Sequence, residues 1–344
     1  MPPMKIDENE LVKRLMIHQL TFLTAEEKIL LQTNIDSYNT LAILSIEELS
    51  YIIKRNVGKG FFAPEEIKKA ALVANRMIQS LEIKYLFYED DDFPPLLKEM
   101  KDPPYMLFYR GNADCLFNSC VSIAGTRNAT PSGLTAAHNF AKDAGDSGFT
   151  VISGLAFGID ASGHKGALES NFGKTAAVLP CGIDSVVPCG NKKLAEQILK
   201  NGGVLLSEYM PGILASKFRY VQRNRILAAL SPATVIIQSP SGGGAMLTAG
   251  FALDYNRYVF FHSTCFDEQS EMLEKQCVLR LKMQSQKRKD GGERWLKNKL
   301  FNCPRRFVEE GASVINDFHD YCREFREDFS GLNKGGDCQL DFTF

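Results

Sequence analysis

The stretch GLAFGIDASGHKGALES, residues 154–170, contains two residue types that acid–base chemistry uses. Asp160 and His164 are four positions apart, so on a helix they would share one face. A nucleoside hydrolase could use such a pair as its acid and base. No carboxylate cluster or nucleophile accompanies them, which favours a structural interpretation. We therefore expect Asp160 to accept hydrogen bonds from helix-start amides and His164 to be hydrogen-bonded in place, and we assign no catalytic residue.

The stretch GTRNATPSG, residues 125–133, has the composition of an anion-binding turn. Gly125 allows a tight turn, and Arg127 is a bidentate phosphate donor. Thr130 can cap the helix that follows, and the start of a helix presents free N–H groups that attract anions. The alternative is an ordinary turn with a solvated arginine.

Three successive glycines stand in SPSGGGAMLTAG, residues 239–250, directly after an apolar run. Successive backbone amides can form a nest for an anion, and we assign Gly243 and Gly244 to such a contact. The alternative is a flexible turn.

Cations and aromatic rings are interleaved in SKFRYVQRNR, residues 216–225, which contains no acidic residue. Single-stranded nucleic acid needs this combination, because cations track its phosphates and rings stack on its exposed bases. The alternative is a basic helix start whose aromatic side chains lie in the core. The residues that we assign to a nucleic-acid contact here are Lys217, Tyr220, Arg223, Asn224 and Arg225.

The elements that must position these loops alternate between strands and helices. Short apolar runs such as CVSIAG, FTVISG, TAAVLP and ATVIIQS lack polar alternation, as expected of strands that are buried on both faces. Helical stretches separate them, which predicts an α/β fold with an extended, Rossmann-like, doubly wound and mostly parallel sheet. In such sheets ligands bind at the carboxyl ends of the strands, where the loops described above lie.

Changes in composition and in the spacing of apolar residues divide the chain into four parts. The first part has apolar residues at helical spacing and capping signals at Thr24 and Ser45, which predicts a small all-helical domain of the SAM or helix-hairpin-helix kind. Residues 280–299 contain eight basic and two acidic residues, and we interpret them as part of an insertion that is part helical and part mobile. The predicted parts are a helical domain at 1–80, a Rossmann-like DNA-binding domain at 81–264 and 301–325, a basic insertion at 265–300, and a flexible tail at 326–344.

The composition excludes several classes of protein. The 344 residues are 44% hydrophobic and 24% charged, as in a soluble globular protein. The formal net charge of −1 excludes a uniformly basic surface, so any nucleic-acid site must be a local patch. The nine cysteines include no CxxC pair, so we expect no disulfide framework, no metal and no cofactor. The apolar runs are too short to span a bilayer and the N-terminus lacks the apolar core of a signal peptide, so we expect a cytoplasmic protein.

Taken in order, these motifs resemble those of the DNA-processing protein A family (DprA, also called Smf). The resemblance covers about residues 82–262 and 302–323 and rests on GTRNATPSG, on SGLAFGIDASGHKGALE, on LPCGIDSVVPCGN and on YVQRNR. It implies a protein that is no enzyme, binds and protects incoming single-stranded DNA as a homodimer, and loads the RecA recombinase onto it in competence and natural transformation. By this resemblance Arg127 and the five residues assigned in 217–225 would line the DNA pocket. We assign Gly125 and Thr126, in the same loop as Arg127, to the DNA contact as well.

The sequence also departs from the pattern of this family. Gln238 and Ser239 stand where many members have Glu-Ala, and His262 and Ser263 replace the Pro-Gly after a late strand, which leaves the local turn in doubt. Many members end in a winged-helix domain, whereas only about twenty residues follow residue 325 here, too few for that module. We therefore expect the functions that depend on a winged helix to be absent.

Other functions remain open on the sequence. A nucleoside-monophosphate-processing enzyme of similar fold would need a glutamate where Ala249 stands. A nucleotide-sensing module could use the same pocket for a small phosphorylated ligand. Finally, QLDFTF, Gln339 to Phe344, resembles peptides that dock on the bacterial sliding clamp, with a frayed tail as the alternative.

Overall fold

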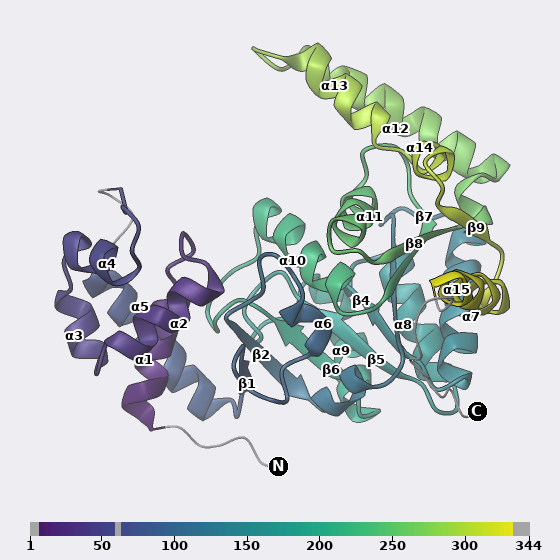
Figure 1. Cartoon of the computed structure of the whole chain (residues 1–344). Coiled ribbons are helices and arrows are strands. Elements are labelled where there is room, and N and C mark those ends of the chain that lie inside the picture. The colour runs from purple at the N-terminus through teal and green to yellow at the C-terminus, as the bar shows by residue number, and fades with distance from the viewer. Residues whose placement is uncertain (1–6, 59–62, 333–344) are drawn as a thin grey trace. The chain divides into compact units, whose positions relative to one another are not determined.

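The computed structural model of the protein describes residues 7–58 and 63–332, with side chains described through residue 325. The chain divides into two compact units, Met1–Phe117 with Ala176–Leu230 and Asn118–Thr175 with Ser231–Phe344. Figure 1 labels most of the helices and strands of both. Both units combine helices with strands, and most strand pairs are parallel, which confirms the predicted α/β class. The boundaries between these two units differ from the domain boundaries predicted from the sequence, which remain a prediction.

The strands of the first unit follow the order β1-β2-β6-β5. The pairs β1–β2 and β2–β6 are antiparallel, whereas β5 and β6 are parallel with Ala177 opposite Leu205. The bounds are β1 (Lys84–Phe87), α6 (Pro95–Lys98), β2 (Met106–Gly111), η1 (Ala113–Phe117), β5 (Lys174–Val178), η2 (Cys189–Asn191), α9 (Lys192–Lys200), β6 (Val204–Ser207) and α10 (Lys217–Ala229).

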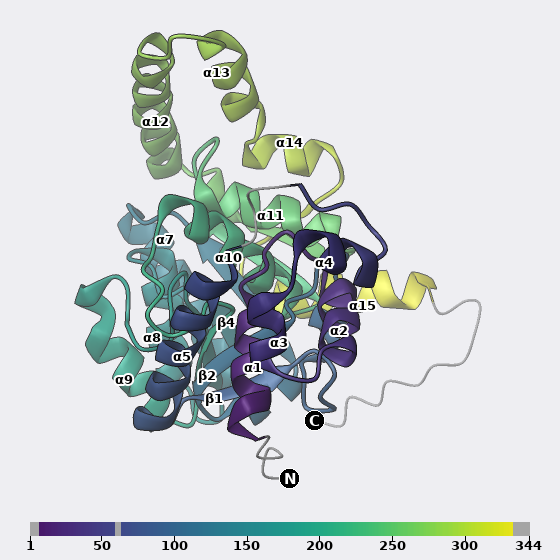
Figure 2. The same cartoon turned by 90° about the vertical axis from the view of Figure 1, so that its left-hand side faces the viewer.

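Within residues 7–58 and 63–83, five helices precede these strands and pack on one another, as Figure 2 shows. They are α1 (Glu8–His18), α2 (Ala25–Asn34), α3 (Tyr38–Ile43), α4 (Ile46–Ile52) and α5 (Pro64–Ser80). The predicted caps are confirmed as full capping boxes, Thr24 with Glu27 and Ser45 with Glu48. Helix α3, which Ser37 caps, was not part of the prediction.

His18, the last residue of α1, holds this helical region against the turn after β6. Its ring Nε2–H donates to the backbone oxygen of Glu208 at 2.8 Å, while its Nδ1 is buried without a hydrogen-bond partner among the described residues. Burial, together with the nearby Lys28 ammonium, lowers the pKa of His18 to about 3. The imidazole is therefore neutral in the folded protein at any ordinary pH.

The free energy of unfolding should fall by about 2 kcal/mol between about pH 7.5 and 5 because of His18 alone. The unfolded chain binds a proton at this residue below a pKa of 6.5, whereas the folded chain does so only near 3. This contribution is therefore complete above pH 6.5 and is lost as the pH falls towards 3. Urea unfolding at both pH values should show a smaller difference for His18→Gln than for the wild type and for the exposed-site control His319→Gln. Equal differences in all three would contradict the assignment.

The strands of the second unit follow the order β4-β3-β7-β8-β9, and each neighbouring pair is parallel. Helices α7, α8 and α15 surround an apolar core in which the rings of Phe140, Phe318 and Tyr321 meet edge to face or stacked. The bounds are β3 (Cys120–Gly125), α7 (Pro131–Asp146), β4 (Thr150–Ser153), α8 (Ile159–Glu169), β7 (Ala233–Gln238), α11 (Gly244–Asp254), β8 (Tyr258–His262), η3 (Ser263–Cys265), β9 (Ser313–Ile315) and α15 (Phe318–Leu332). After β8, His262 Nδ1 accepts the Thr264 N–H at 3.1 Å, so a side chain holds the turn that the sequence left in doubt.

Between β8 and β9 the second unit contains a helical hairpin, formed by α12 (Glu268–Gln286) and α13 (Gly292–Phe301) and followed by α14 (Pro304–Glu309). The two helices lie side by side in Figures 1 and 2. Gly291, with φ of +66°, makes the reversal, and Ser285 Oγ donates to the Gly292 oxygen across it at 2.8 Å. The helical part of the predicted insertion is thereby confirmed. Among the described residues no helix, α12 included, is both long and apolar enough to cross a membrane.

Candidate nucleic-acid interface

The loop after β3 has the conformation that its residues predict. Thr130 caps α7 by accepting the Gly133 N–H at 3.2 Å, and Pro131 occupies the first helical turn. Gly125 must lack a side chain, because a Cβ there would lie 2.4 Å from the Ile159 side chain. Arg127 is exposed between these two points. The predicted helix cap is confirmed, and Arg127 is accessible to a ligand.

Gln238, which the sequence marked as a departure from the family pattern, organises this loop. Its buried Oε1 accepts the Thr130 N–H at 2.9 Å, and its Nε2 donates to Thr130 Oγ1 and to Ser270 Oγ, both at 2.8 Å. Its backbone oxygen accepts the Thr126 N–H at 2.7 Å. A carboxamide can both donate and accept, so Gln238 links the loop to the first turn of α12.

Asp160 and His164 are held as the structural interpretation expected. Asp160 Oδ2 accepts the Ala156 N–H at 3.3 Å, and His164 Nδ1 lies 2.6 Å from Thr175 Oγ1. Both side chains are buried. The start of α8 packs against the loop after β3. Gly158, with φ of +77°, lies so close to the Thr126 and Arg127 carbonyls that no Cβ would fit there.

The glycine-rich loop before α11 is bonded to the rest of its own unit. The Ser241 N–H donates to Glu274 Oε2 at 2.7 Å and its hydroxyl donates to the same carboxylate. The Gly242 N–H donates to the Asn302 oxygen at 2.7 Å, and the Gly243 N–H donates to the Pro240 oxygen at 3.1 Å. The amide of Gly243 is thus already used, which differs from the open amide nest that the sequence suggested.

Gly244 differs from its neighbours because a Cβ there would meet nothing within 4 Å. The space in front of this residue is open, so a ligand could approach the backbone at the start of α11. Contact of Gly243 and Gly244 with DNA stays a prediction. Such a contact would use the open space at the Gly244 backbone and not the Gly243 amide, which is already bonded.

Helix α10 separates its cations into exposed and buried ones. Lys217 is exposed, and Tyr220 and Asn224 are partly buried. Arg223 and Arg225 are only 5% and 8% exposed. Burial of these two arginines differs from the solvent-facing cations that the sequence suggested, and their contact with DNA stays a prediction.

The two buried arginines are bonded within the first unit. Arg223 Nη1 donates to the Val178 oxygen at the end of β5. Arg225 Nη1 donates to the Asp102 oxygen at 2.7 Å, and its Nη2 forms an ion pair with the Glu208 carboxylate. Both therefore hold α10 in place, which makes them positioning residues for the exposed first turn of the helix.

The residue that the sequence did not assign is Phe218, whose side chain is 69% exposed. It stands beside Lys217 in the first turn of α10, which Ser216 caps. The sequence left open whether the aromatic side chains of this stretch lie in the core. The side chain of Phe218 does not. Its signal was the alternation of rings and cations, but only the fold shows which ring faces solvent.

The predicted residues thus fall into two groups. The first unit carries those on α10. The second unit carries the loops after β3 and β7, which are neighbouring parallel strands with Gly125 paired opposite Gln238, so both loops leave the sheet at the same edge. The first group is Lys217, Tyr220, Arg223, Asn224 and Arg225, and the second is Gly125, Thr126, Arg127, Gly243 and Gly244.

One group of described side chains has ligand atoms close enough to share a metal ion. Asp317, His319 and Asp320 place these atoms within 4.8 Å of one another at the surface. Asp320 already accepts hydrogen bonds from Asn316, which lower the pKa of its carboxyl. Exposed groups of this kind are common without a metal, and the expectation of no metal stays a prediction.

Comparison with known proteins gives consistent matches. The sequence model for DNA recombination-mediator protein A matches residues 84–289. Protein Smf of Borreliella burgdorferi is 30% identical over 256 residues, which cover 74% of this chain and 80% of that protein. Protein Smf of Synechocystis is 40% identical over 181 residues, which cover 52% of this chain and 45% of that protein. The chain therefore spans about half the length of several relatives that it matches.

Two solved structures share the fold. DNA processing protein A from Streptococcus pneumoniae superposes with a TM-score of 0.66 at 24% identity, over 93% of this chain and 99% of that one. The protein of the same name from Helicobacter pylori, described for its single-stranded DNA binding mode, superposes with a TM-score of 0.53 at 25% identity, over 72% of this chain and 97% of that one. The predicted fold class is confirmed.

Proposed function

The chain belongs to the DNA recombination-mediator protein A family, and from this membership we propose that it binds single-stranded DNA. The observation that carries the proposal is the first turn of α10, where the exposed Lys217 and Phe218 stand side by side. A cation there can pair with a phosphate, and a ring that faces solvent can stack on a base.

The loop after β3 supports the same function in the second unit. Arg127 is exposed at the start of α7, where the helix dipole favours an anion. Gln238 and Gly158 restrain the backbone of this loop, so its conformation does not have to be formed when DNA binds. We assign Arg127 to phosphate contact, with Gly125 and Thr126 shaping the turn.

The finer parts of the proposal follow from family resemblance. We propose that the protein acts in natural transformation and recombination as a cytoplasmic homodimer, protects incoming DNA, and loads a RecA-type recombinase without enzymatic activity of its own. Supporting this, relatives named DNA processing protein DprA from Streptococcus pneumoniae and Bacillus subtilis match half of this chain. The proposed sliding-clamp contact through Gln339 to Phe344 lies outside the described residues.

Fluorescence anisotropy with a labelled oligo-dT tests the proposal. The double variant Lys217→Ala/Phe218→Ala should bind at least about fivefold more weakly than the wild type, because one lost base stack is worth about 1–3 kcal/mol. Arg127→Ala should weaken binding and reduce the salt dependence by about 0.7 in the log–log slope, the value for one phosphate contact. A matched control is Lys165→Ala/Phe172→Ala, which removes an equally exposed cation and ring elsewhere.

Competition by AMP separates the DNA proposal from a small-ligand function. Displacement of the oligonucleotide by AMP, or saturation by AMP without affinity for oligo-dT, would favour nucleotide sensing and overturn DNA binding. Processing of nucleoside monophosphates has less support, because Ala249 is fully buried in α11 and offers no acid at the position where such enzymes need one.

A further inference from the structure

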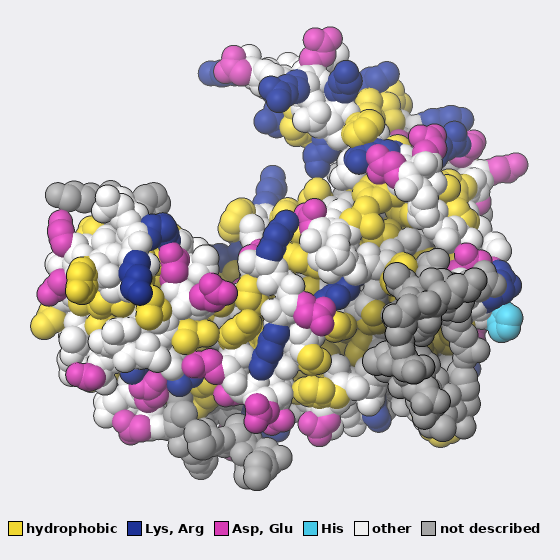
Figure 3. Space-filling model, in the orientation of Figure 1, with side chains coloured by type: hydrophobic (Ala, Val, Ile, Leu, Met, Phe, Trp, Pro, Cys, Tyr) yellow, Lys and Arg dark blue, Asp and Glu magenta, His cyan; other side chains and the backbone are white. Residues whose placement is uncertain are grey.

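The α12–α13 hairpin carries a long run of positive charge. Residues 280–299 hold eight basic and two acidic residues, in a protein whose net charge is −1. Figure 3 shows Lys and Arg side chains gathered over this hairpin. Seven of the eight cations are exposed, namely Arg280, Lys282, Lys287, Arg288, Lys289, Arg294 and Lys297.

These seven cations are not neutralised by the protein itself. Within the part of the chain that the structure describes, none of them forms an ion pair with a carboxylate. Arg288 instead lies over the ring of Trp295, 4.9 Å from its centroid. Like charges held together on two packed helices repel one another, and a polyanion relieves that repulsion.

The base of the hairpin is fastened to the glycine-rich loop after β7. Glu274 of α12 accepts both the N–H and the hydroxyl of Ser241, and Lys299 of α13 donates to the Gly242 oxygen at 3.2 Å. That loop leaves the sheet at the same edge as the loop of Arg127. The hairpin therefore starts beside the proposed phosphate contact of the second unit. Helix α12 is about 28 Å long for its 19 residues, and its turns after Cys277 extend beyond these contacts.

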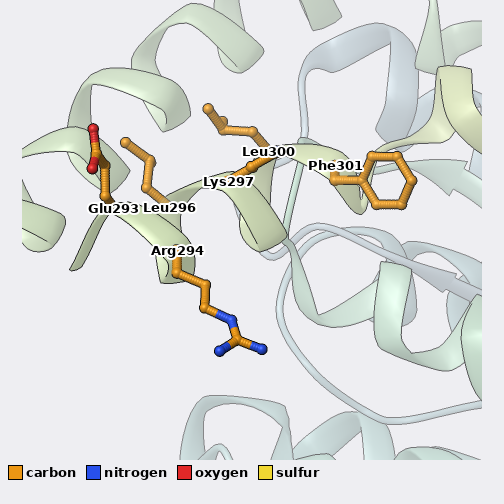
Figure 4. A pocket seen from close by; sticks show the side chains of 6 residues that line it. All are labelled: Glu293, Arg294, Leu296, Lys297, Leu300 and Phe301. Carbon is orange, nitrogen blue, oxygen red and sulfur yellow. The ribbon is translucent and has the colours of Figure 1, made fainter. Parts of the chain in front are cut away.

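The hairpin also exposes a ring among its cations. Phe301, at the end of α13, is 60% exposed and lines a shallow pocket with Leu300 and Lys297. Figure 4 shows the side chains of Arg294 and Phe301 extending from this helix. The Arg306 guanidinium lies 4.2 Å from the centroid of the Phe301 ring, on one face. Cations near an exposed ring match the chemistry of a single strand, with phosphates for the charges and bases for the ring.

We propose that the α12–α13 hairpin is a second contact surface for single-stranded DNA, which extends the path of the strand from the loops after β3 and β7. This inference rests on the proposed function. It predicts that part of the affinity for long strands, and part of its salt dependence, comes from this hairpin. A short strand that contacts only the loops after β3 and β7 would not reach the hairpin.

The test compares two triple variants with the same change in charge. Lys282→Gln/Lys287→Gln/Lys289→Gln alters the hairpin, and Lys192→Gln/Lys193→Gln/Lys200→Gln alters three exposed lysines of α9. Anisotropy is measured against salt with oligo-dT of about 6 and about 30 nucleotides, shorter and longer than one usual binding site. The hairpin variant should lower the log–log salt slope by about 2 for the long strand, at about 0.7 per phosphate, and leave the short strand unaffected. The α9 variant should match the wild type on both.

Failure of this inference is distinguishable from failure of the proposed function. If the wild type binds, Lys217→Ala/Phe218→Ala weakens binding, and the two triple variants behave alike, the hairpin makes no DNA contact and a protein partner becomes the occupant to seek. If the wild type binds neither strand, the proposed function is wrong and this inference falls with it.

Discussion

Replacement of Arg225 by alanine is expected to lower the free energy of unfolding by about 3–5 kcal/mol, the usual effect of removing one partner from a buried ion pair. The side chains of Arg225 and Glu208 are 9% and 18% exposed. Without the guanidinium, the partly buried Glu208 carboxylate loses its ion-pair partner and keeps the electrostatic attraction of the Lys28 ammonium, and the Asp102 oxygen loses a donor. Chemical unfolding followed by circular dichroism measures the loss.

The double variant Arg225→Ala/Glu208→Gln should recover part of that stability, because it also removes the carboxylate charge that has lost its ion-pair partner. A single variant that unfolds like the wild type would show that the pair is not important for the fold. The same contacts decide how DNA-binding experiments are interpreted. A loss of DNA binding in Arg225→Ala would be explained by displacement of α10, so variants of the exposed Lys217 and Phe218 are the better test of direct contact.

Gly166→Ala is expected to destabilise the second unit by about 3 kcal/mol or more, at the upper end of overpacking effects. A Cβ at this position would lie 2.0 Å from the backbone oxygen of His138 in α7. A backbone atom cannot rotate away as a side chain can, so α7 and α8 would have to separate. Thermal unfolding should show a lower midpoint or no folded second unit.

The matched control for this prediction is Gly163→Ala, one turn earlier on α8. A Cβ there would lie 3.7 Å from the Ile123 side chain, an ordinary contact. Because alanine favours a helix over glycine by about 0.5–1 kcal/mol, this variant should be neutral or more stable than the wild type. Similar losses in both variants would mean that the α7–α8 packing is not what requires Gly166.

Local signals in the sequence determined the order of elements. The caps at Thr24, Ser45 and Thr130 were predictable because a capping side chain bonds to an amide only three residues away. The buried strands were predictable because their apolar runs are continuous. Helix α3 was not, since its six residues make fewer than two turns and show no period.

Only the tertiary structure decided which side of each motif faces solvent. Arg225 and Lys217 look equivalent in the sequence, yet one is buried against Glu208 and the other is exposed. Gln238 reaches Thr130 across 108 positions, and Glu274 reaches Ser241 across 33. Such partners meet through sheet order and helix packing, which no local spacing encodes. The sequence alone therefore determined the fold class and the motifs, because both follow from short-range patterns. Burial and long-range contacts separated the residues that position the candidate site from those that it exposes to solvent.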